Sequence, residues 1–392
     1  MEKMFGELGL RIASPYLRLG VESSSKACNY YPTKVLRAFH SALPRLDQKR
    51  AVSSEPTAVR PATESNAIIK KVTAPFLASK KRHGQKVTMV TAYDYPSALH
   101  VDRAGIDVLL VGDSCAMVEL GYETTQPITM EEMLHHCKAV HRGANRALLV
   151  GDMPLGSYEV DDREALRNAY RFIKEAGMDA VKVEGGSKAR AQTVCKIVEG
   201  GVAVMGHVGL LPQAISVIGG FRAQGRTAVR AREILDEAMR LQDAGAFAIV
   251  VECVPAPVAK AIEDTLEIPT IGIGAGPFTT GQVLVYHDML GMTSHPHHQH
   301  FVPKFCKKYA RVGDAITQGL AQFKQDVEAS TFPGTEFSPY NMSQPEEELF
   351  LKYLERDASE RELLHLETAE RMKNADEYEA LNLYGYTNGN NK

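Results

Sequence analysis

The chain has 392 residues, of which 45 are Lys or Arg and 48 are Asp or Glu, so its formal net charge is −3. This balance argues against a protein built mainly to bind nucleic acid, and no apolar run reaches the ~18–20 residues that a membrane-spanning helix needs. The six cysteines form no CxxC pair, so we expect neither a disulfide scaffold nor a structural zinc site.

The N-terminal segment 1–66 is expected to lie outside the folded domain. Its first 60 residues contain ten Lys and Arg but only five acids. A basic, serine-containing and acid-poor segment is typical of a mitochondrial transit peptide. We therefore expect a transit peptide followed by a disordered arm, and a mitochondrial protein. The alternative is a disordered arm that carries no targeting signal, in a cytoplasmic protein.

The central segment 67–332 alternates between strand and helix patterns. Short, continuous apolar runs rich in β-branched residues are typical of parallel strands that are buried on both faces. The expected strands are 87–92, 107–112, 147–151, 180–183, 202–206, 246–251, 269–273 and 284–286.

Helix signals lie between most of these runs. Thr129 and Glu132 have the spacing of a capping box, which predicts a helix through Val140. Asp161 and Asp162 suit the first turn of another helix that stops by Gly177, and 232–244 predicts a third. Eight strands with crossover helices fit a (β/α)8 TIM barrel better than an open doubly wound sheet.

The C-terminal segment 333–392 is acidic. From Glu346 to Lys392 it contains twelve acids and six Lys or Arg. The pattern from Glu346 to about Leu383 predicts a partly helical tail that is solvated or loosely docked. A helix that binds a partner is the alternative.

Acidic residues follow several of the expected strands, at the end of a barrel where the chemistry lies. Asp113 follows the second strand and Asp152 the third, while Lys182 and Glu184 lie two apart on one side of the fourth. Converging carboxylates repel each other, and a divalent cation such as Mg²⁺ relieves that repulsion. We expect Asp113, Asp152 and Glu184 to bind Mg²⁺, directly or through water. The alternative is that one or two of them cap helices.

Two further strands end in a titratable residue. Glu252 follows four apolar residues, and a partly buried carboxylate there suits a general base; the alternative is an ion pair. His207 either hydrogen-bonds substrate or satisfies a buried carbonyl. The 295–300 stretch contains four histidines, and we interpret it as a polar loop insertion, with metal binding as the alternative.

Seven short motifs occur in a fixed order and together resemble the ketopantoate hydroxymethyltransferase family over roughly residues 67–332. They are 91–97, 111–114, 181–186, 206–210 with Pro212-Gln213, 252–255, 271–276 and 302–305. After Gly-Asp-Ser114, this chain has Cys115-Ala116 where the family commonly has Leu-Gly. The basic N-terminal extension and the acidic C-terminal tail are similar to those of a eukaryotic, fungal-type member of this family.

The resemblance implies a barrel of the phosphoenolpyruvate mutase-like superfamily. It implies transfer of a hydroxymethyl group from 5,10-methylenetetrahydrofolate to 3-methyl-2-oxobutanoate, through a Mg²⁺-stabilised enolate, giving 2-dehydropantoate in pantothenate biosynthesis. Its partners would be small-molecule substrates and copies of itself, in a decamer-type homo-oligomer.

The resemblance also implies roles for individual residues. Metal contacts fall at Asp113, Asp152 and Glu184, and the catalytic base is Glu252. Substrate contacts fall at Asp113, Ser114, Asp152 and Lys182, to which the residue pattern adds His207. Two alternatives are a Mg²⁺-dependent C–C lyase or mutase of the phosphoenolpyruvate mutase type, and a non-catalytic barrel that acts as an assembly partner.

Overall fold

The computed structural model describes residues 70–220, 222–292 and 303–355. The predicted transit segment, the histidine-rich loop and the tail beyond residue 355 therefore lie outside the described residues. The chain divides into two compact units, residues 1–314 and 315–392, which are described separately below.

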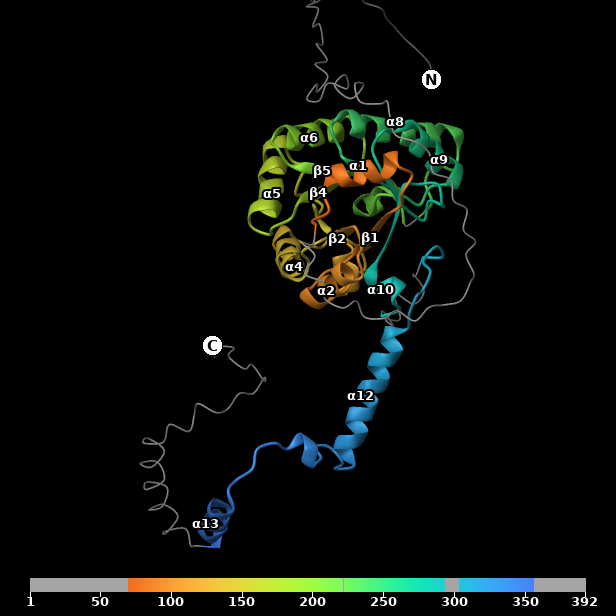
Figure 1. Cartoon of the computed structure of the whole chain (residues 1–392). Helices are drawn as coiled ribbons and strands as arrows, with labels where there is room; N and C mark the ends of the chain where they lie inside the picture. Colours follow the sequence, from red (N-terminus) through yellow and green to blue (C-terminus); the bar gives the residue numbers. More distant parts are fainter. Residues whose placement is uncertain (1–69, 221, 293–302, 356–392) are drawn as a thin grey trace, which may run out of the picture. The chain divides into compact units, whose positions relative to one another are not determined.

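Eight parallel strands close into a barrel in chain order, which confirms the predicted (β/α)8 architecture (Figure 1). The strands are β1 (Val87–Thr91), β2 (Val108–Val111), β3 (Leu148–Asp152), β4 (Ala180–Glu184), β5 (Ala203–Gly209), β6 (Ala248–Glu252), β7 (Thr270–Ile273) and β8 (Gly281–Leu284).

The prediction for the eighth strand is wrong in its position. The strand is Gly281–Leu284, and Tyr286 begins the short helix α10 (Tyr286–Met289) instead. Gly281 pairs with both Val87 and Ile271, and a Cβ on it would collide with the carbonyl oxygen of Val87. A glycine is therefore required where the apolar pattern leads one to expect a larger residue.

The helices surround the barrel, and their starts follow the capping signals. Thr129 and Glu132 form the predicted capping box at the start of α4, and Asp161 caps α5. The helix predicted from Arg232 begins earlier, at Ala228, because Thr227 accepts the backbone N–H of Arg230. The remaining bounds are α1 (Ala74–Arg82), α2 (Tyr95–Arg103), α3 (Cys115–Val118), α4 (Met130–Gly143), α5 (Asp162–Lys174), α6 (Lys188–Glu199), η1 (Pro212–Ala214), α7 (Ile215–Ile218), α8 (Ala228–Asp243) and α9 (Ala256–Thr265).

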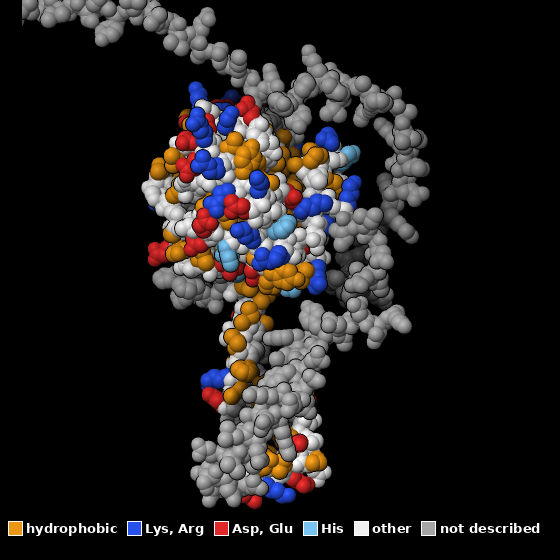
Figure 2. Space-filling model, turned by 90° about the vertical axis from the view of Figure 1, so that its left-hand side faces the viewer, with side chains coloured by type: hydrophobic (Ala, Val, Ile, Leu, Met, Phe, Trp, Pro, Cys, Tyr) orange, Lys and Arg blue, Asp and Glu red, His pale blue; other side chains and the backbone are white. Residues whose placement is uncertain are grey.

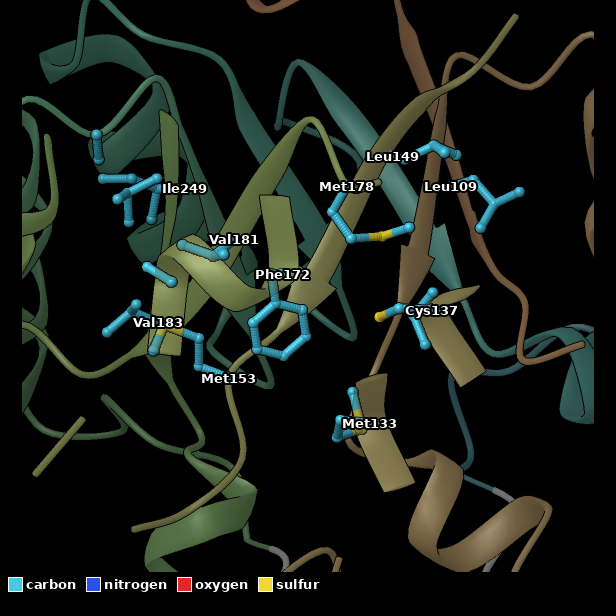
Figure 3. Packing of buried hydrophobic residues seen from close by; sticks show 14 of the residues in the cluster. Leu109, Met133, Cys137, Leu149, Met153, Phe172, Met178, Val181, Val183 and Ile249 are labelled. Atoms are coloured by element: carbon cyan, nitrogen blue, oxygen red, sulfur yellow. The ribbon is translucent and has the colours of Figure 1, made fainter. Parts of the chain in front are cut away.

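Side chains alternate between two apolar layers along each strand. Leu109, Leu149 and Val181 point outward into the layer between strands and helices, part of which Figure 3 shows. There Phe172 of α5 lies beside Met178, and both pack on Gly151 of β3. The intervening residues point inward and fill the barrel.

Helix α1 covers the amino ends of the strands. Its Leu77 belongs to the apolar cluster inside the barrel. Lys80 Nζ lies 2.6 Å from Asp107 Oδ2, just before β2, and Lys81 donates to the carbonyl of Ile268, just before β7. These contacts close one end of the barrel and leave the carboxyl ends of the strands for the site.

The second unit holds most of α12 (Val312–Glu328), η2 (Thr335–Phe337) and α13 (Gln344–Glu355). Hydrophobic side chains, among them Leu320 and Phe323, are exposed along α12 (Figure 2). Helix α13 begins at Gln344, just before the predicted helical stretch, and covers that stretch as far as Glu355, where the described residues end. Among the described helices, none is both long and apolar enough to cross a membrane.

Candidate active site

A cavity of about 720 Å³ opens at the carboxyl ends of the strands. The predicted site residues all line it: Asp113, Ser114, Asp152, Lys182, Glu184, His207 and Glu252. The strands place most of them by alternation. Asp152 of β3, Lys182 and Glu184 of β4, His207 of β5 and Glu252 of β6 continue the inward-facing positions above the apolar filling.

Strand register then determines which of these side chains meet. Asp152 is the direct cross-strand neighbour of Lys182, and Glu184 is the neighbour of His207. Neighbouring residues on one face of a sheet lie within contact distance, so the polar contacts of the site follow from the pairing of β3, β4 and β5.

Asp113, Asp152, Lys182, Glu184 and His207 are the buried titratable residues of the cavity, and we call them the cavity floor. Lys182 carries a positive charge among its carboxyl groups. Its Nζ lies 2.5 Å from Asp152 Oδ2 and 3.6 Å from Glu184 Oε1, although only 4% of the residue is exposed. Burial raises the pKa of Asp152 and the Lys182 charge opposes that rise. Burial alone would lower the pKa of Lys182, but the surrounding carboxylates raise it well above its usual value, so the ammonium keeps its proton.

His207 lies between two carboxylates. Its Nδ1 is 3.3 Å from Glu184 Oε1 and its Nε2 is 3.1 Å from Glu252 Oε2. Burial opposes charge on the ring, yet the two carboxylates raise the pKa of His207 to about 9. Against the effect of burial, His207 and Lys182 lower the pKa of Glu184. Both ring nitrogens of His207 therefore lie within ion-pair distance of a carboxylate, and its contact with the substrate stays a prediction.

Asp113 is a buried carboxyl group that lies close to two other acids, Asp152 and Glu184. Burial raises its pKa well above the usual value, and the charges of Asp152 and Glu184 raise it further. Its backbone N–H donates to Asp152 Oδ2 at 3.1 Å, and Gln213 Nε2 donates to its Oδ2 at 3.0 Å. The three carboxyl groups thus share one site, as their positions in the sequence predict.

Several residues without a predicted role hold these groups in place. Tyr93, which is fully buried, makes a 2.8 Å hydrogen bond with the Ser114 hydroxyl. Gln213 and Tyr158 form a hydrogen-bonded pair below Asp113 and Glu184. No local periodicity indicates them, since Gln213 lies 100 residues from the carboxyl group to which it donates.

The donor set suits a hard cation but is not arranged as a closed cage. Asp152 Oδ1 is buried and accepts no hydrogen bond, and carboxylate oxygens are the ligands that Mg²⁺ prefers. Nevertheless, among the residues that the structure describes, no three His, Cys, Asp or Glu side chains form a group that could hold an ion. Lys182 Nζ lies near both Asp152 and Glu184, and His207 lies near Glu184, while Asp113, Asp152 and Glu184 all line the cavity. Mg²⁺ often binds through one or two carboxylates and completes its shell with water and substrate.

The outer lining of the cavity has a different character. Met117, Leu210 and Val254 supply apolar walls, and the exposed side chains of Arg222, Arg226 and Lys304 also line the cavity. The cavity therefore combines an acidic floor, apolar walls and cationic groups near solvent. A parallel barrel with titratable groups gathered at the carboxyl ends of its strands has the arrangement of an enzyme that works by acid–base chemistry.

Comparison with known proteins identifies which enzymes of this class the chain is similar to. A model of the family described as "Ketopantoate hydroxymethyltransferase" matches residues 71–335. The chain therefore belongs to the ketopantoate hydroxymethyltransferase family and is an enzyme of that family.

Individual relatives are similar over most of the chain. The 3-methyl-2-oxobutanoate hydroxymethyltransferase 1, mitochondrial, of Arabidopsis thaliana is 56% identical over 286 residues, which are 73% of this chain and 82% of that protein. The 3-methyl-2-oxobutanoate hydroxymethyltransferase of Heliobacterium modesticaldum is 51% identical over 269 residues, 69% of this chain and 95% of that protein. Among solved structures, phosphonopyruvate hydrolase in complex with oxalate and Mg²⁺ aligns with a TM-score of 0.46 and 11% identity, over 67% of this chain and 92% of that one.

Proposed function

We propose that this chain transfers a hydroxymethyl group from 5,10-methylenetetrahydrofolate to 3-methyl-2-oxobutanoate, giving 2-dehydropantoate for pantothenate synthesis. The observation that supports this most directly is that the carboxylate, ammonium and hydroxyl groups needed for enolate chemistry line one cavity in a member of this family. The names of its relatives point to the same 2-oxo acid.

The proposed chemistry begins with removal of the C3 proton of the 2-oxo acid by Glu252. Its side chain is 17% exposed, and His207 holds one of its oxygens, which leaves the other for the substrate. General base catalysis of this kind contributes about 10²–10⁴-fold in rate. The methylene carbon of the folate is at the oxidation level of formaldehyde. Water would break its two C–N bonds and supply the oxygen, so that tetrahydrofolate leaves. The enolate carbon would then add to the formaldehyde carbonyl, whose oxygen takes up a proton to become the hydroxyl group of the product.

Lys182 and Ser114 bind and orient the substrate in this scheme. The Lys182 ammonium neutralises the substrate carboxylate or the developing oxyanion. Ser114 donates its hydroxyl from a position that the hydrogen bond to Tyr93 fixes. Asp113, Asp152 and Glu184, which line one cavity, would hold Mg²⁺ directly or through water. When bound, Mg²⁺ would act as a Lewis acid that stabilises the enolate by several kcal/mol.

The folate co-substrate has support in the size and charge of the cavity. A volume of about 720 Å³ exceeds what the small 2-oxo acid fills, and pockets for drug-sized ligands span about 300–1,000 Å³. Arg222, Arg226 and Lys304 would bind the glutamate carboxylates of the folate.

Proton–deuterium exchange at C3 of 3-methyl-2-oxobutanoate tests the proposal. We expect the wild-type chain to catalyse exchange when Mg²⁺ is present and Glu252→Gln to abolish it, while calorimetry still detects binding of the 2-oxo acid. Glu267→Gln, an exposed residue before β7, is the matched control and should exchange normally. Exchange by Glu252→Gln at the wild-type rate would remove Glu252 from the role of base, and turnover of phosphonopyruvate instead would favour the mutase alternative.

Mitochondrial location is part of the proposal. The Arabidopsis relative is named as mitochondrial, and the basic composition of residues 1–66 is typical of a transit peptide. Import of the full chain into isolated mitochondria, with loss of the N-terminal segment, would support it. A chain that stays outside would contradict it.

Assembly of the chain with copies of itself remains a prediction from family resemblance. The same holds for the domain limits 1–66, 67–332 and 333–392. Analytical ultracentrifugation of the full chain tests the assembly, since a monomer at micromolar concentration would contradict it.

A further inference from the structure

Every hydrogen-bonding group of Gln213, in its backbone and in its side-chain amide, has a partner. It lies in the single turn η1 after β5 and is 4% exposed. Its Nε2 donates to Asp113 Oδ2 and to the carbonyl of Met153, each at 3.0 Å. Its backbone N–H donates to Glu184 Oε2 at 3.2 Å. One residue thus contacts two of the three acids of the cavity floor and the residue that follows the third.

The side-chain orientation of Gln213 is fixed by the direction of these hydrogen bonds. The Tyr158 hydroxyl donates to Gln213 Oε1 and accepts the backbone N–H of Glu184 at 3.4 Å. The backbone carbonyl of Met153 can only accept, so the amide nitrogen must face it. A rotated amide would place the amide oxygen against this carbonyl oxygen and lose the hydrogen bonds of buried polar groups. The network therefore has one arrangement.

The ring of Tyr158 is in turn held from its outer side. The Arg190 guanidinium lies 4.2 Å from the ring centroid, and its Nη1 donates to the Tyr158 carbonyl at 3.1 Å. The network is thus anchored in α6 as well as in the strand ends. A rigid, satisfied network of this kind maintains distances between the groups that it joins.

We infer that Gln213 is the positioning residue that sets the separation of Asp113 and Glu184, and thereby the affinity of the cavity floor for a small divalent cation. This inference rests on the metal site of the proposed function and adds the residue that shapes it. Mg²⁺ demands near-ideal octahedral coordination, and loss of residues that orient ligands lowers metal affinity about 10–100-fold.

Binding of Mn²⁺ to the full chain, followed by electron paramagnetic resonance and by competition with Mg²⁺, tests the inference. In Gln213→Leu the side-chain donors are lost at nearly constant volume. We expect about a tenfold or larger loss of Mn²⁺ and Mg²⁺ affinity, and a changed line shape for the bound ion. A general loss of stability would not change the spectrum of the ion in the folded fraction.

Gln126→Leu is the matched control. The side chain of Gln126 donates to the backbone carbonyl of Gln213 at 2.9 Å and to the Ser216 hydroxyl, not to an acid of the floor. The affinity of the Gln126→Leu variant for Mn²⁺ should therefore stay within about twofold of wild type. If Gln213→Leu does not fold, Tyr158→Phe removes the donor to Gln213 Oε1 and should also weaken Mn²⁺ binding.

The outcomes separate the inference from the proposed function. A wild-type chain that binds no Mn²⁺ would overturn the metal site and, with it, this role of Gln213. A wild-type chain that binds Mn²⁺, with Gln213→Leu or Tyr158→Phe unchanged in affinity and line shape, would overturn the inference alone. A loss in Gln126→Leu as large as in Gln213→Leu would assign the effect to the turn rather than to the amide.

Discussion

Replacing Lys182 by Met removes the buried cation that the carboxylates of the cavity floor surround. At an effective dielectric constant near 20, an ammonium 2.5 Å from one carboxylate oxygen and 3.6 Å from another is attracted by about 7 and about 5 kcal/mol. Desolvation of the buried ammonium opposes this by several kcal/mol. We therefore expect Lys182→Met to lower the free energy of unfolding by about 3–5 kcal/mol, the usual result of removing one partner of a buried pair.

The loss should depend on pH. Burial raises the pKa of Asp152 and the Lys182 charge opposes that rise, so in the variant the pKa of Asp152 rises further above its value in the unfolded chain. A carboxyl group with a raised folded-state pKa destabilises the fold while it is ionised, and this penalty disappears as the pH falls and the group takes up a proton. The deficit should be largest near pH 8 and shrink towards pH 5. Adding Asp152→Asn to the variant should recover part of it.

Urea unfolding followed by circular dichroism, with EDTA present, measures these differences. Lys260→Met is the matched control, because Lys260 Nζ lies 2.7 Å from Asp264 Oδ2 at an exposed site, where an ion pair contributes about 0–1 kcal/mol. A loss in Lys182→Met no larger than in this control, or a loss that is the same at pH 8 and pH 5, would refute the reasoning.

Three further predictions concern other parts of the barrel. Phe172→Ala should lower the free energy of unfolding by about 3–5 kcal/mol, because the fully buried ring leaves a cavity against β3; a loss below about 1 kcal/mol in urea unfolding would mean that the layer collapses to fill it. Hydrogen bonds from Lys80 and Thr88 outweigh burial and lower the pKa of Asp107, so Asp107→Asn should be less stable than wild type at pH 7 and the difference should fade below about pH 4; a difference that persists at pH 2 would contradict this. Arg226→Gln should raise KM for the folate but not for the 2-oxo acid in steady-state kinetics, whereas Arg103→Gln, at the amino end of the barrel, should change neither.

The sequence predicts the barrel and its acidic end because both depend on local patterns. Continuous apolar runs indicate buried parallel strands, and the two-residue period places Lys182 and Glu184 on one face. The position of β8 escapes prediction, since Gly281 and Gln282 interrupt the apolar pattern at a place where packing demands a glycine. The contacts of Gln213 escape it too, because they join segments far apart in the chain.

Charge relations inside the cavity are likewise decided by the fold. The sequence presents His207 as a donor for substrate or backbone, whereas the register of β4 and β5 places it beside Glu184. The site is therefore predictable as a set of residues, but its internal pairing depends on which strands lie side by side.

The closure of the amino end by α1 has a kinetic consequence. In the described part of the barrel, apolar side chains and Leu77 fill the half below the acids, so reactants reach the floor from the carboxyl end. In the proposed reaction the 2-oxo acid would lie at the closed end and the larger one-carbon carrier nearer the opening. This arrangement predicts an ordered addition, in which the 2-oxo acid binds first and tetrahydrofolate leaves before the product.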